Sequence, residues 1–191
     1  FASGSRATDA KTDAFFDGAG QNLLAGMLLA AAVGGRPIAQ VFSWLTDSTD
    51  EEPVRLLRDG GYPMIGDAVL GIIQSTDKLR GSVYSTGQEM AACLKNTQVA
   101  DWVNPRGADD PRPQFDAAAF VRGRGTLYSL SKEGAGTAGP LVTALTAATL
   151  EAATDLADTS PGGRLRTPLV GILDEAANVC RWRDLPDLYR S

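Results

Sequence analysis

The segment N-P-R-G-A-D-D-P-R-P, residues 104–113, divides the chain into two parts with different sequence patterns. Its three prolines cannot continue a helix, and its glycine and alternating charges are typical of a loop. We therefore place a domain boundary here. Residues 1–110 form one predicted unit and residues 113–191 another.

The part before this boundary predicts one helix after another. The first runs from a cap at Thr8 or Asp9 to Val33, where Gly34-Gly35 ends it. Further helices are predicted from Pro37 to Leu45, after the acidic start Thr49–Pro53, from Met64 to Gln74, and from Thr76 to Leu94. Gly60-Gly61 ends the helix that follows Thr49–Pro53. The apolar spacing of the first helix favours a helical bundle, with aromatic residues in its core (Phe15, Phe16, Trp44, Trp102).

The part after the boundary alternates between helix and strand. A short helix is predicted over Phe115–Val121, a strand over Gly125–Leu130, a long helix over Gly139–Asp158, and an apolar strand over Thr167–Leu173. A helical crossover of this length between two strands predicts a βαβ unit, hence a few parallel strands. The predicted fold is α-rich, with an all-α bundle beside part of an α/β domain.

The amino-acid composition excludes several classes of catalytic and metal-binding site. The 191 residues contain no histidine, so no Ser-His-Asp set and no histidine zinc site can form. Cys93 and Cys180 are too few for a zinc cluster and indicate a reducing compartment, with both predicted to be buried and apolar. With 18 Lys and Arg against 23 Asp and Glu, the net charge of −5 disfavours a protein that wraps duplex DNA. The longest apolar run, Leu23–Val33, is too short to span a bilayer.

The stretch L-V-G-I-L-D-E, Leu169–Glu175, is the strongest local motif for chemistry. An apolar strand that ends in two acids is typical of a Walker B element, because the carboxyl ends of parallel strands are where α/β sheets bind ligands. Asp174 would then hold Mg²⁺, and Glu175 would orient or deprotonate the attacking water in phosphoryl transfer. The alternative is that both acids end a strand only because it reaches solvent there.

A Walker A motif, G-x-x-x-x-G-K-[ST], is absent from the sequence. The nearest string, residues 4–12, has alanine rather than glycine directly before its lysine, and we interpret Lys11-Thr12 as exposed first-turn residues. The chain cannot by itself form a complete ATP site. Because it also begins with Phe1, we expect it to be a piece of a longer protein.

Taken in order, several stretches resemble the coupling proteins of type IV secretion systems, the TraG/TraD-like ATPases of conjugative DNA transfer. D-E-A-A-N-V (174–179) followed by D-L-P-D-L (184–188) is similar to the Walker B region of that family. Residues 15–32, 120–131 and 139–145 resemble the helix after its first motif, the strand before its Walker B helix, and the start of that helix. Ala176 stands where many members carry Phe.

The resemblance implies an all-α domain inserted into a RecA-like P-loop domain, with residues 1–110 as the insertion. It implies ATP and Mg²⁺ as cofactors of the intact protein and a homo-hexamer that moves single-stranded DNA on the cytoplasmic side of the membrane. Relaxase and other relaxosome proteins, together with secretion-channel proteins, are the implied partners. The fragment alone would be a soluble docking module without ATPase activity. The alternative is a non-catalytic helical domain that binds proteins or DNA.

Other residues keep more than one interpretation. Lys132 and Glu133 could approach a nucleotide or lie in a solvated loop. Arg122 and Arg124 could complete a neighbouring ATP site, contact DNA, or be solvated. Trp182, between two arginines, could stack on a base or pack on its own domain.

Overall fold

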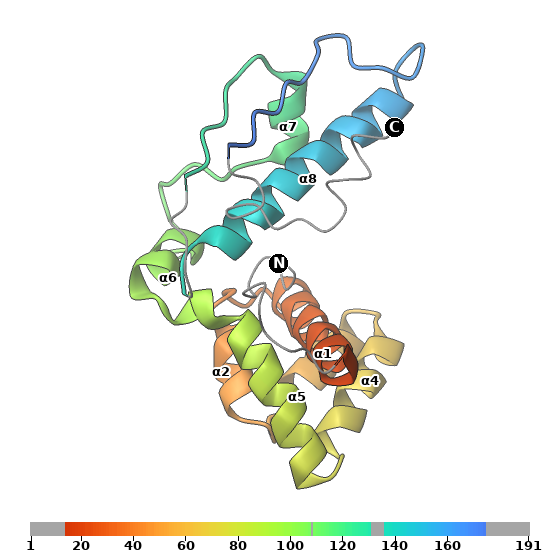
Figure 1. Ribbon diagram of the computed structural model, residues 1–191, viewed down its shortest axis with the longest axis vertical. Helices are drawn as coiled ribbons and strands as arrows, with labels where there is room; N and C mark the ends of the chain where they lie inside the picture. The colour runs from red at the N-terminus through yellow and green to blue at the C-terminus, as the bar shows by residue number, and fades with distance from the viewer. Residues whose placement is uncertain (1–13, 108, 131–135, 175–191) are drawn as a thin grey trace.

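The helices of the first half enclose the core of the protein. The computed structural model describes residues 14–107, 109–130 and 136–174. In chain order the helices are α1 (Ala14–Val33), α2 (Gln40–Thr46), α3 (Glu52–Asp59), α4 (Pro63–Ile73), α5 (Asp77–Met90), the 3₁₀ helix η2 (Ala92–Lys95), α6 (Thr97–Val103), α7 (Ala117–Arg122) and α8 (Gly139–Asp158). Helices α1–α5 lie together, α7 and α8 lie together, and α6 lies between the two groups (Figure 1). The predicted α-rich character is confirmed.

Helix α1 is the centre of the bundle, because it packs against α2, α3, α4 and α5. Its Leu24, Met27 and Ala30 are almost fully buried, at the helical spacing that the sequence indicates. Trp44 of α2 and Leu57 of α3 are fully buried in the same core. The apolar second half of α1 is thus covered by neighbouring helices.

Pairs of glycines end α1 and α3, as predicted. Gly35 has a positive φ of 60°, and the next residue, Arg36, donates its backbone N–H to the carbonyl of Ala31 at 2.8 Å. Gly61 has a φ of 88°, and Tyr62 donates to Leu57 at 2.8 Å in the same way. This Schellman arrangement needs a left-handed residue, which glycine provides at low cost.

The other predicted helix bounds hold with small shifts. Pro37 begins a tight turn, and α2 starts at Gln40. The predicted helix over 76–94 divides into α5 and η2. The proposed cap of α1 at Thr8 or Asp9 lies outside the described residues.

Two strand predictions differ from the structure. Residues 125–130 and 167–173 are irregular, and the described residues form no strand. A strand needs a neighbour to pair its backbone groups, and neither segment has one within the described part of the chain. The apolar side chains are consequently exposed: Val170 by 76% and Ile172 by 88%.

Two core assignments are also wrong. Trp102 is 61% exposed because its side chain, on the seven-residue helix α6, points away from the bundle. Phe15 is exposed at the start of α1, where its ring lies edge-on to that of Phe16. Phe16 is half-buried against the core, and the placement of Trp44 is confirmed.

Candidate functional site

Asp174 is the one residue of the predicted Walker B pair that the structure describes. It is exposed and follows the irregular segment 167–173, so no sheet edge positions it among the described residues. Glu175 lies outside the described residues, as do Lys132, Glu133 and Trp182. Of these predicted site residues, only Asp174 therefore has a described position.

The described residues do not complete a Mg²⁺ site. They contain no group of three or more His, Cys, Asp or Glu side chains able to hold a metal ion. Mg²⁺ takes six oxygen ligands and commonly keeps several waters, so Asp174 would supply only part of such a site. No reaction step through Mg²⁺ follows from these residues.

Arg122 and Arg124 lie at the end of α7 and just after it, both exposed. The guanidinium of Arg122 donates at 2.8 Å to the carbonyl of Ala118 in its own helix, one turn back. A cation at a helix C-terminus is favourable because the last carbonyls carry partial negative charge. In this structure Arg122 stabilises its own helix.

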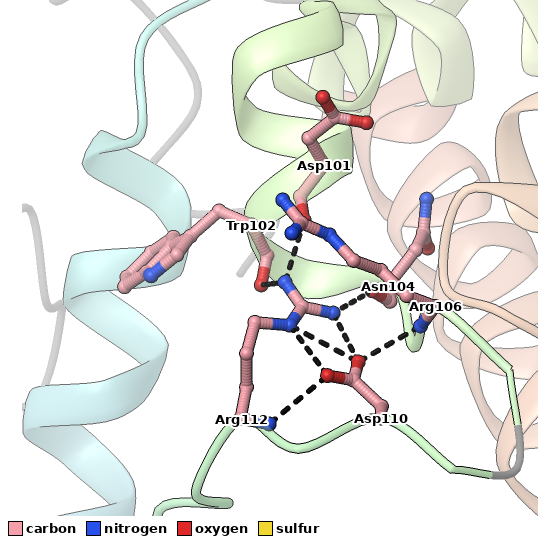
Figure 2. A network of polar contacts seen from close by, with 6 residues as sticks. All are labelled: Asp101, Trp102, Asn104, Arg106, Asp110 and Arg112. Atoms are coloured by element: carbon pink, nitrogen blue, oxygen red, sulfur yellow. Dashed lines mark hydrogen bonds and ion pairs between the residues drawn. The ribbon is translucent and has the colours of Figure 1, made fainter.

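A polar network that sequence patterns do not reveal surrounds the C-terminus of α6 (Figure 2). The guanidinium of Arg112 donates to the carbonyls of Asp101 at 2.7 Å, Trp102 at 3.2 Å and Asn104 at 2.5 Å. The carboxylate of Asp110 holds that guanidinium from the other side, with Nε 2.9 Å from Oδ1. The segment predicted as a simple linker thus folds back and caps a helix.

Asp110 is the acceptor at the centre of this network. Its side chain is 7% exposed, and it also accepts the backbone N–H groups of Arg106 at 2.8 Å and Arg112 at 3.1 Å. The guanidinium of Arg112, followed by these two N–H groups, holds the pKa of Asp110 well below its ordinary range and raises that of Arg112. The charged pair is therefore the stable form at neutral pH.

A second network joins α2 to α3 through Glu52. Trp44 donates its indole N–H to Oε2 at 3.0 Å, and Arg36 donates Nε to Oε1 at 3.0 Å. The hydrogen bond from Trp44, and then that from Arg36, lowers the pKa of Glu52. Glu52 was predicted only as a first-turn acid, and its contact with a buried indole is not visible in the local sequence.

The bundle also buries groups with reactive or polar atoms. Cys93 is buried, as predicted, and loss of solvent raises the pKa of its thiol to about 11. Burial raises the pKa of Tyr84 to about 12, and its hydroxyl has no hydrogen-bond partner among the described residues. Cys180 lies outside the described residues. The raised pKa makes Cys93 a poor nucleophile at neutral pH.

No family model matches the chain, and no significant match is found among curated proteins or solved structures. Within the described part of the chain, no helix has both the length and the apolar character needed to cross a membrane.

Proposed function

We propose that this chain is the all-α insertion and the Walker B region of a type IV secretion coupling ATPase. In this proposal residues 1–110 dock relaxosome proteins. Residues 113–191 contribute Asp174 and Glu175 to an ATP site completed by a Walker A motif elsewhere in the intact protein. That protein works as a hexamer on the cytoplasmic side of the membrane and passes single-stranded DNA to the secretion channel.

The observation that carries the proposal is the apolar segment before Asp174. Val170 and Ile172 are exposed in a stretch whose composition is that of a buried parallel strand. Tyr128 and Leu130 are exposed by 85% and 91% in the other predicted strand. Apolar stretches of this kind are expected where a sheet is completed by strands from another part of the protein.

The division of the chain also supports the proposal. The helices α1–α5 share one core, and α7 packs against α8 rather than joining that core. An insertion domain needs a core of its own, since it must fold between two segments of its host domain. The bundle meets this requirement.

The coding sequence upstream of Phe1 tests the proposal most simply. We expect a G-x-x-x-x-G-K-[ST] motif in the same reading frame. An open reading frame that begins close to Phe1, or one whose upstream part lacks this motif, would contradict the assignment. ATP turnover by the purified 191-residue chain would contradict the view that an essential part of the site lies elsewhere.

Protein docking by the bundle, without any catalytic role, is a second candidate. It is favoured by Tyr62 and Met64, which are both exposed where α4 begins, Met64 by 84%. The net charge of −5 suits a basic partner, which an acidic surface attracts over a distance.

A pull-down with the relaxase encoded by the same genetic element tests this docking role. We expect retention at low salt, loss of retention as salt rises, and weaker retention by Met64→Lys than by Lys78→Met at an exposed position on α5. No retention at low salt would remove the docking role.

A further inference from the structure

Helix α6 contacts the C-terminal part of the chain at its N-terminal end. Asn96, which precedes the helix, accepts the backbone N–H of Gln98 at 3.0 Å through Oδ1. Its Nδ2 donates to the carbonyl of Gly136 at 3.3 Å, just ahead of α8. One side chain therefore both caps α6 and joins it to the approach to α8.

The C-terminal end of α6 is held by the segment that follows it, residues 104–113. The last carbonyls of a helix have no partner within the helix and must find donors elsewhere. Arg112 supplies these donors, and Asp110 fixes the orientation of its planar guanidinium from the opposite side (Figure 2). Arginine, unlike lysine, can make all of these contacts at once because its donors form a rigid fork.

Helix α6 is in turn attached to the bundle. It packs against η2, and Asn104 at its end accepts the backbone N–H of Ala39 at 3.2 Å, at the entry to α2. On the other side, only residues 113–116 separate Arg112 from α7, which packs against α8. The contacts of Arg112 thus shorten the tether between the bundle and the α7–α8 pair from residues 104–116 to residues 113–116.

We infer that α6, with Asn96, Asn104, Asp110 and Arg112, is a rigid joint that sets the position of the α7–α8 pair relative to the bundle. A segment of this length without the clamp would let the two parts separate and rotate, since a flexible tether gains conformational entropy with length. The joint holds α6 at both ends and leaves a short tether. This inference does not depend on the proposed function.

Distance measurements between spin labels on the full 191-residue chain test the joint. Lys78→Cys on α5 and Glu151→Cys on α8 introduce two exposed labelling sites, in a Cys180→Ser background in which the buried Cys93 does not label. We expect one narrow distance distribution for this doubly labelled protein. Arg112→Ala should widen the distribution by about twofold or more, since it lengthens the free tether. Arg112→Lys should widen it as well, because lysine keeps the charge and loses the fork.

Arg80→Ala is the matched control. Arg80 caps α4 within the bundle, donating to the carbonyls of Ile73 at 2.8 Å and Ser75 at 3.1 Å and pairing with Asp77. Its loss should lower the melting temperature and leave the width of the distribution unchanged. A parent-like width in both Arg112 variants would overturn the inference, and so would equal broadening by Arg80→Ala. A broad distribution in the parent protein would overturn it as well.

Discussion

The indole N–H of Trp44 donates a 3.0 Å hydrogen bond to Glu52, the first residue of α3. Trp44 is fully buried, whereas Glu52 lies at the edge of the core, where it also pairs with Arg36. The buried indole thus has a partner for its polar atom, and that partner is a carboxylate at the positive end of a helix. Three consecutive parts of the bundle are joined through one side chain.

Glu52→Gln should lower the free energy of unfolding at pH 7 by about 1 kcal/mol, because the amide loses the ion pair with Arg36 and keeps only one of the two oxygens that accept from Trp44 and Arg36. The pKa of Glu52 is lowered from 4.5, so its contribution is fully present above about pH 4.5 and is lost as pH falls through the lower folded value. Urea unfolding followed by circular dichroism at several pH values measures this difference, which should shrink toward acid. Glu51→Gln at the neighbouring exposed position should change little, and an equal effect from it would contradict the assignment.

Gly20→Ala should destabilise the bundle by about 1–3 kcal/mol, because a Cβ at this position would lie 2.6 Å from Cγ2 of Thr86 on α5. Gly18→Ala in the same helix meets nothing within 4 Å and should stabilise the protein by a few tenths of a kcal/mol or more. Thermal unfolding of the two variants measures both effects. If they changed stability in the same direction, the close packing of α1 on α5 would be wrong.

Leu57→Ala should lower the free energy of unfolding by about 2–5 kcal/mol, since Leu57 is fully buried in the bundle core. Leu130→Ala makes the same chemical change at a side chain that is almost fully exposed, and should change stability by less than about 0.5 kcal/mol. Chemical unfolding of both variants provides the comparison. Comparable losses would show that residues 125–130 are packed rather than exposed.

Cys93 should resist modification in the native state. Burial blocks the reagent, and a pKa of about 11 leaves little thiolate at pH 8. In a Cys180→Ser background, reaction with Ellman's reagent should be slow and become fast once guanidinium unfolds the chain. Rapid reaction of the native variant would mean that η2 is not packed in the core.

The helices of the bundle were predicted well because helix ends and apolar spacing depend on residues that are close together in the sequence. A glycine that must adopt a positive φ is recognisable from its position after an apolar run, and Gly35 and Gly61 both end helices in this way. The apolar spacing of α1 likewise indicated which face is buried. Trp102 was misplaced because the spacing says which face of α6 is apolar and not whether a neighbour covers it.

The candidate site was less predictable, for two physical reasons. A strand depends on a partner, so the composition of residues 167–173 could not determine whether the described chain would pair it. The clamp of Arg112 depends on backbone carbonyls of α6, which carry no sequence signal. The prolines and charged residues of the segment 104–113 indicated only that a loop lies there.

The proposed role of Glu175 is the central functional claim, and ATP hydrolysis by the intact protein tests it most directly. We expect Glu175→Gln to lower the turnover number by about 10²-fold or more while ATP still binds, as expected for loss of a group that activates water. Asp158→Asn, at the exposed end of α8, is the control and should keep parent activity. Parent-like turnover by Glu175→Gln would contradict the assignment of a Walker B element to Leu169–Glu175.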